Sequence, residues 1–166
     1  MIVPNSSGEK LKGDFRLLHE IGLDDPVEHY LRQGWQSGIE PNGSFEGRLL
    51  YPYFEGAGYF GPPAITSLRL RAAGGPVCAS LAEAQHWADA IRGGDLFDAN
   101  RYGDRFSGTI EALDPALHYV IVGERMDIAP SDGFDPAYYR ERYPDIARSG
   151  ISCLGHYVSA CFRGSG

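Results

Sequence analysis

A ten-residue pattern that recurs along the chain decides the fold. Its clearest copy is Phe134-Asp135-Pro136-Ala137-Tyr138-Tyr139-Arg140-Glu141-Arg142-Tyr143. Two further copies are Phe97-Asp98-Ala99-Asn100-Arg101-Tyr102-Gly103-Asp104-Arg105-Phe106 and Phe45-Glu46-Gly47-Arg48-Leu49-Leu50-Tyr51-Pro52-Tyr53-Phe54. Each copy opens with Phe and an acidic residue, and it carries an apolar residue at offset five and an aromatic residue at offset nine. Repetition of one pattern along a chain predicts a repeat architecture.

The segments that follow the copies also repeat. His-Tyr pairs occur at His29-Tyr30, His118-Tyr119 and His156-Tyr157, with Ser67-Leu68 as a degenerate counterpart. The first two pairs each lie 16 residues before the Phe that opens the next copy. Phe97 and Phe134 are 37 residues apart, whereas Phe45 and Phe97 are 52 residues apart. The longer interval therefore holds an insertion.

These intervals predict a single domain over residues 1–166. We expect a mainly α fold, an array of about four two-helix repeats of about 37 residues with one inserted helix. The copies are expected at residues 6–44, 45–75, 97–133 and 134–166, and the insertion at 76–96. In the first copy, Leu11 and Phe15 take the offset-five and offset-nine positions.

The repeated pattern has the features of a helix start. Asp135 is a suitable N-cap, and Pro136 fits the first helical position because its missing N–H is not needed there. The Phe before the cap and Tyr139 form a hydrophobic staple. Tyr139 and Tyr143 lie on one helix face, and every copy keeps this pair apolar, so we expect both to be buried. Pro144 is expected to end the helix.

The second helix of each copy is expected to be amphipathic. In the first copy, apolar or small residues recur at i, i+3, i+4 and i+7: Val27, Tyr30, Leu31 and Gly34. The inserted segment predicts a further amphipathic helix over residues 80–91, with Ser80 as its N-cap. We expect that helix to pack on the second repeat.

Composition and charge exclude several classes of protein. The 166 residues carry 15 Lys+Arg against 22 Asp+Glu, a formal net charge of −7, and 43% of them are apolar. The apolar content disfavours wholesale disorder. The acidic balance disfavours a nucleic-acid partner, because phosphate binding needs a basic surface. No run of about 18 apolar residues is present, so membrane insertion is not expected.

No residue pattern indicates catalysis, a metal site or a cofactor. The three cysteines, Cys78, Cys153 and Cys161, form neither a metal-binding nor a disulfide pattern. His29, His118 and His156 hold equivalent positions a repeat apart, which is too far for a shared metal ion. Each is expected to pack beside the following residue and to bond a backbone carbonyl. We therefore expect a protein that is not an enzyme, and a small glycosidase is the less favoured reading.

The repeats resemble a family at the level of their motif. The order Phe-Asp-x-x-Tyr-Tyr, Tyr-Pro-Asp, His-Tyr, then Gly and Pro before the next Phe-Asp resembles tandem repeats of bacterial surface-polysaccharide proteins. Those repeats often accompany glycosyltransferase domains in capsule or cell-wall polysaccharide enzymes, where they are not the catalytic part. Residues 134–166 match best, whereas the second copy lacks His-Tyr and the third has Ser107-Gly108 in place of Pro-Asp. The resemblance implies a non-catalytic role beside a polysaccharide.

Exposed aromatic rings stack on the apolar C–H face of a sugar, so rings that the fold does not need are candidates for carbohydrate binding. The offset-four position holds Lys10, Leu49, Arg101 and Tyr138 in the four copies and is therefore expected to face solvent. One turn on, the same stripe holds Tyr53 and Arg142, and Arg142 is suited to sugar hydroxyls or to the carboxylate of an acidic sugar. Trp35 follows Gly34 at a position that holds Ala73, Glu124 and Phe162 in the other copies, so it is also expected to be exposed. The predicted carbohydrate-binding residues are Trp35, Tyr53, Tyr138 and Arg142.

Two hypotheses follow for function. The first is non-catalytic recognition of bacterial capsular polysaccharide, including as a spike or fibre component of a phage-like particle. The second is a cytoplasmic accessory or scaffold module of a polysaccharide glycosyltransferase system. Both imply other protein subunits as partners. Because residues 1–8 lack the basic start and apolar stretch of a signal peptide, we expect the protein in the cytoplasm or on a particle released by lysis.

Overall fold

The computed structural model describes residues 25–72, 78, 80–106 and 112–163. Within these ranges the chain is helical and contains no strand, so the prediction of a mainly α fold is confirmed. The number of repeats stays a prediction. The expected helix around Leu11 and Phe15 lies outside the described residues.

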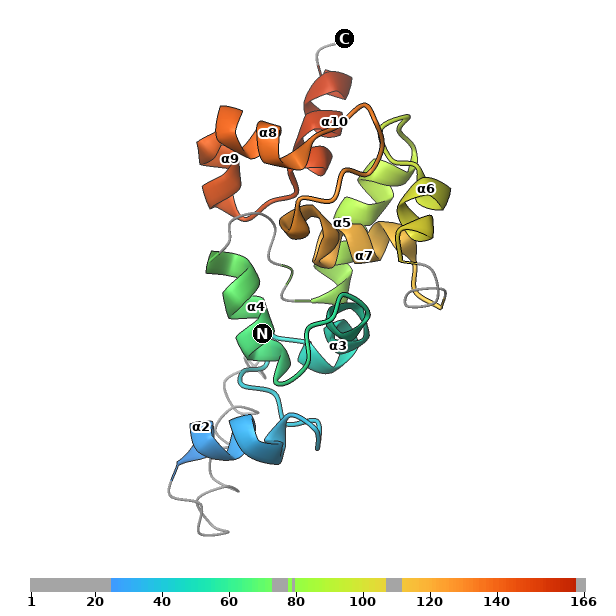
Figure 1. Ribbon diagram of the computed structural model, residues 1–166. Coiled ribbons are helices and arrows are strands. Elements are labelled where there is room, and N and C mark those ends of the chain that lie inside the picture. The colour runs from blue at the N-terminus through green and yellow to red at the C-terminus, as the bar shows by residue number, and fades with distance from the viewer. Residues whose placement is uncertain (1–24, 73–77, 79, 107–111, 164–166) are drawn as a thin grey trace, which may run out of the picture.

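The helices follow the chain from one end of the molecule to the other. They are α2 (Pro26–His29), the π-helix η1 (Tyr30–Gly34), α3 (Gly47–Gly56), α4 (Pro63–Ala72), α5 (Leu81–Arg92), α6 (Ala99–Asp104), α7 (Pro115–Ile121), the 3-10 helix η2 (Gly123–Met126), α8 (Pro136–Arg142), α9 (Pro144–Ser149) and α10 (Cys153–Arg163). Helix α2 lies at one end, α5 and α7 lie in the middle, and α8, α9 and α10 gather at the opposite end (Figure 1).

Short polar side chains start the helices, as the sequence predicts. Asp135 accepts a hydrogen bond from the backbone N–H of Tyr138, and Ser80 accepts one from Glu83. Three further helices, α2, α6 and α7, begin in the same way at Asp25, Asp98 and Asp114. The first-turn N–H groups of a helix have no partner inside it, so each cap stabilises its helix by about 1 kcal/mol.

Glutamates outside the helix also accept hydrogen bonds from the first turns of α3, α10 and α5, in addition to the Ser80 cap of α5. The Glu40 carboxylate accepts from the backbone N–H of Arg48 in α3 (2.9 Å), and Glu46 accepts from Leu81 in α5 (2.8 Å). Glu124, which is fully buried, accepts from the first residue of α10 (2.6 Å). Glu46 adjoins the start of α3 and Glu124 belongs to η2, so their bonds join separate elements, whereas the Glu40 bond ties the loop before α3 to that helix.

The predicted staples are confirmed in the third and fourth copies. The ring centroids of Phe97 and Tyr102 are 5.7 Å apart, and those of Phe134 and Tyr139 are 5.4 Å apart. All four rings are buried in one hydrophobic cluster, which also contains the equivalent pair of the second copy, Phe45 and Leu50.

The expectation that Tyr143 is buried was wrong. Helix α8 ends at Arg142, one residue before it, and Tyr143 is 42% exposed, although its ring still lies 4.7 Å from that of Tyr139. Pro144 does end α8, but it also opens α9, because proline fits the first position of a helix. Gly150, with a φ of 77°, then ends α9. Tyr143 therefore stands at the corner between two helices.

The inserted helix α5 is present where expected, but its position differs from the prediction. It packs mainly on α7 and α10 of the third and fourth copies rather than on the second copy. The Trp87 ring lies so close to α10 that a side chain at Gly155 would start 2.4 Å from it. The bare backbone at Gly155 thus makes room for the tryptophan, and α5 joins two copies into one core.

Candidate functional site

Two of the four predicted binding residues lie together on α8. Tyr138 follows the Asp135 cap and points away from the core, with 66% of its surface exposed. Arg142, four residues further along the helix, is also exposed. Side chains at i and i+4 are neighbours on a helix surface. The structure therefore places Tyr138 and Arg142 on one solvent-facing stripe.

Two further tyrosines, which sequence analysis did not single out as binding residues, are also partly exposed and lie against α8. Tyr143 and Tyr157 are 42% and 40% exposed, and both rings contact the buried ring of Tyr139, at centroid distances of 4.7 and 6.1 Å. The Arg142 guanidinium lies 5.5 Å from the centroid of the Tyr143 ring. We call this set the tyrosine surface: Tyr138, Arg142, Tyr143 and Tyr157.

A sequence signal for Tyr143 was available. It precedes Pro144, and a residue before proline is disfavoured in the helical conformation. The helix therefore stops short of Tyr143 and leaves its ring partly in solvent. The sequence around Tyr157 carries no comparable signal. Its equivalents Tyr30 and Tyr119 also follow a histidine, and both of them are buried.

Trp35 lies elsewhere, at the end of η1, and is half-buried rather than exposed. Its ring packs against Tyr51 of α3 at a centroid distance of 5.2 Å. Helices α3 and α8 lie towards opposite ends of the molecule, so Trp35 does not belong to the tyrosine surface (Figure 1).

Tyr53 also departs from the expectation that its stripe faces solvent. Its ring is half-buried against the hydrophobic core, and burial raises the pKa of its hydroxyl. The reason is that α3 packs on α7, so one turn of the stripe is covered while Leu49, one turn earlier, stays exposed. Tyr53 is thus separate from the other predicted binding residues.

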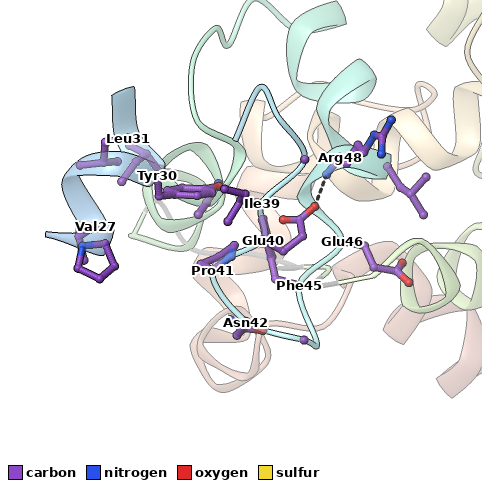
Figure 2. A pocket seen from close by; sticks show the side chains of 16 residues that line it. Val27, Tyr30, Leu31, Ile39, Glu40, Pro41, Asn42, Phe45, Glu46 and Arg48 are labelled. Carbon is purple, nitrogen blue, oxygen red and sulfur yellow. Dashed lines mark hydrogen bonds between the residues drawn. The ribbon is translucent and has the colours of Figure 1, made fainter. Parts of the chain in front are cut away.

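A pocket of about 710 Å³ lies between α2, η1 and the start of α3 (Figure 2). Its apolar lining includes Val27, Leu31 and Leu49, and none of the four predicted binding residues lines it. Glu40 points into the space between these elements and caps α3, as the dashed line to Arg48 shows. Burial raises the pKa of the Glu40 carboxyl.

The face of α2 and η1 that lines the pocket is exposed, whereas the equivalent helix face is buried in other copies. Val27 and Leu31 are 62% and 39% exposed, although the amphipathic stripe predicted them to be core. Their equivalents in α10, Leu154 and Val158, are buried, and α5 packs on that helix. No described helix covers α2 and η1 as α5 covers α10, which explains the difference.

The histidines serve the fold, but through a different bond from the one expected. Nδ1 of His118 lies 2.7 Å from the Tyr102 hydroxyl, and Nδ1 of His156 lies 2.8 Å from the Tyr139 hydroxyl. The partner is thus a tyrosine of the preceding helix rather than a backbone carbonyl. The first copy has Leu11 in that tyrosine's place, and its His29 lies 3.5 Å from the side-chain nitrogen of Gln33 instead.

The buried cysteines are not poised as nucleophiles. Burial raises the pKa of the Cys78 and Cys153 thiols to about 12, so both stay protonated at neutral pH. Among the described residues, no group of three or more His, Cys, Asp and Glu side chains is arranged to hold a metal ion.

None of the helices in the described ranges is both long and apolar enough to span a bilayer. No family model, curated protein or solved structure matches the chain.

Proposed function

We propose that the protein is a non-catalytic module that recognises bacterial surface polysaccharide through the tyrosine surface. The observation that carries the proposal is that three tyrosines at the α8 and α10 end of the chain, Tyr138, Tyr143 and Tyr157, are partly exposed, with the Arg142 guanidinium over the Tyr143 ring. An exposed ring presents a flat apolar face to the C–H face of a sugar, and a guanidinium donates to its hydroxyls. The buried ring of Tyr139 contacts two of these rings, Tyr143 and Tyr157.

A repeating polymer suits such a surface, because many weak sugar contacts along one chain add through multivalency. Trp35, half-buried beside Tyr51, offers a further ring at another part of the molecule. In this proposal the protein works within a larger assembly, such as the spike or fibre of a phage-like particle, and leaves the polysaccharide intact.

The test is a binding screen of the full chain against purified capsular polysaccharides, followed by Tyr138→Ala. We expect loss of binding with an unchanged melting temperature, because Tyr138 is 66% exposed and belongs neither to the hydrophobic core nor to the side chains packed against it. Phe60→Ala is the matched control, since Phe60 is also a highly exposed ring but lies between α3 and α4. Equal losses for both variants, or release of reducing ends from the polymer, would contradict the proposal.

One observation favours the alternative, a scaffold module of a glycosyltransferase system. The apolar residues Val27, Leu31 and Leu49 stand exposed around the pocket, as at a protein contact. Val27→Asp combined with Leu31→Asp separates the two functions. Loss of association with transferase subunits favours the scaffold, whereas unchanged polysaccharide binding by the same variant favours the tyrosine surface.

A further inference from the structure

The charge of Arg142 is available to a ligand. Among the described residues, Arg142 forms no ion pair, whereas other arginines, such as Arg92, Arg101 and Arg140, each pair with an aspartate. Its guanidinium is instead held 5.5 Å from the centroid of the Tyr143 ring. This contact does not neutralise the guanidinium, because a cation over an aromatic face keeps its N–H donors and its charge.

The spacing of Tyr138 and Arg142 suits a sugar ring that carries a carboxylate. Side chains at i and i+4 start about 5–6 Å apart on a helix, so a pyranose stacked on Tyr138 presents its substituents to Arg142. The planar guanidinium fork binds a carboxylate with two parallel hydrogen bonds. A neutral sugar offers only hydroxyl groups there and gains no charge-assisted bond.

We propose that the tyrosine surface selects polysaccharides that contain uronic or other carboxylate-bearing sugars over neutral polysaccharides. This inference rests on the proposed function and adds the substrate class. Selectivity comes from direct contact with Arg142 rather than from long-range attraction, because the chain as a whole is acidic, with a net charge of −7, and Glu141 adjoins Arg142.

The test uses polymer pairs that differ only in the carboxyl group. The full chain is titrated with polygalacturonate, alginate and hyaluronan, each beside its carboxyl-reduced form. We expect at least one acidic polymer to bind at least tenfold more tightly than its reduced form. In Arg142→Gln the ratio should fall to near one, whereas Arg142→Lys, which keeps the charge but lacks the fork, should give an intermediate ratio.

Arg69→Gln is the control, because it removes the same charge from an exposed position on α4 and should leave the ratio unchanged. Equal affinity for acidic and reduced polymers in the wild-type protein overturns the substrate class but leaves the proposed function standing. Binding to none of these polymers, nor to the neutral and acidic members of a capsular panel, overturns both.

Discussion

The hydroxyl of Tyr102 lies 2.7 Å from Nδ1 of His118, and both side chains are fully buried. The bond joins α6 to α7, and the fourth copy repeats it between Tyr139 and His156. It explains why a tyrosine occupies the staple position in both of these copies, where an ordinary staple needs only an apolar side chain. The second copy has Leu50 and Ser67 at the two positions, so both partners are replaced there.

Tyr102→Phe tests the cost of leaving His118 without its partner. We expect a loss of about 1–3 kcal/mol in the free energy of unfolding, because a buried polar nitrogen is left unsatisfied. Tyr139→Phe is the matched variant, and its loss should be below about 1 kcal/mol, because His156 is only half-buried and a water molecule can replace the lost partner. Urea unfolding measures both. Equal losses would show that burial does not distinguish the two bonds.

His118 should also make stability depend on pH. Burial lowers its pKa from an ordinary 6.5 to about 4, so the unfolded chain binds this proton more readily than the folded protein does. Neutral His118 therefore makes its full contribution to the free energy of unfolding above pH 6.5. As the pH falls towards 4, the free energy of unfolding decreases by up to about 3 kcal/mol. The ring C–H resonances in an NMR titration should show His118 titrating near 4.

Carboxylates titrate in the same range, so the stability measurement needs a control. His118→Gln should remove this part of the acid dependence, whereas His86→Gln, at an exposed position, should not. An acid slope unchanged in His118→Gln would assign the loss to carboxylates instead.

Much of the fold could be predicted from the sequence because its signals are local. The caps Asp135 and Ser80 and the staple of Phe134 with Tyr139 depend on residues a few positions apart, and all are confirmed. The position of α5 could not be predicted, because it depends on the fit of Trp87 over Gly155, which are 68 residues apart. Sequence order alone wrongly favoured the neighbouring second copy.

The candidate site could also be predicted only in part. Comparison of the copies correctly identified the position of Tyr138 as solvent-facing, because polar residues replace it elsewhere. The comparison failed at the Trp35 position, which holds the fully buried Glu124 in the third copy. Glu124 occupies that position because its carboxylate caps α10. Variation in residue type between copies therefore does not show that a position faces solvent.

Equivalent positions in two copies should respond differently to truncation. Leu154→Ala removes a side chain buried under α5 and should cost about 2–5 kcal/mol. Val27→Ala, at the matching position beside the pocket, should change the free energy of unfolding by less than about 0.5 kcal/mol, because Val27 is largely exposed. Chemical denaturation checks both. If Val27→Ala lowered the free energy of unfolding by more than about 1 kcal/mol, the face of α2 that carries Val27 would be covered in the folded chain.

Gly123 and Gly103 form a matched pair for testing close approach. A Cβ at Gly123 would lie 1.9 Å from the Tyr102 hydroxyl, so Gly123→Ala must displace that ring and should cost about 1–3 kcal/mol. Nothing lies within 4 Å of a Cβ at Gly103 in α6, so Gly103→Ala should be neutral or stabilising by up to about 1 kcal/mol. Thermal unfolding of the two variants measures both changes in stability. Similar losses would contradict the close packing of Tyr102 on Gly123.

The Glu124 carboxylate accepts from both the Ser152 hydroxyl (2.7 Å) and the Cys153 backbone N–H (2.6 Å). Glu124→Ala leaves both buried donors unsatisfied and should cost at least about 2 kcal/mol. Glu124→Gln should cost less than Glu124→Ala, because its amide oxygen still accepts from the Cys153 N–H and only the Ser152 hydroxyl loses its acceptor. Amide hydrogen exchange at Cys153 reports whether its N–H is still bonded, and urea unfolding measures the loss of stability. If Gln proves as costly as Ala, the negative charge rather than the acceptor geometry holds the start of α10.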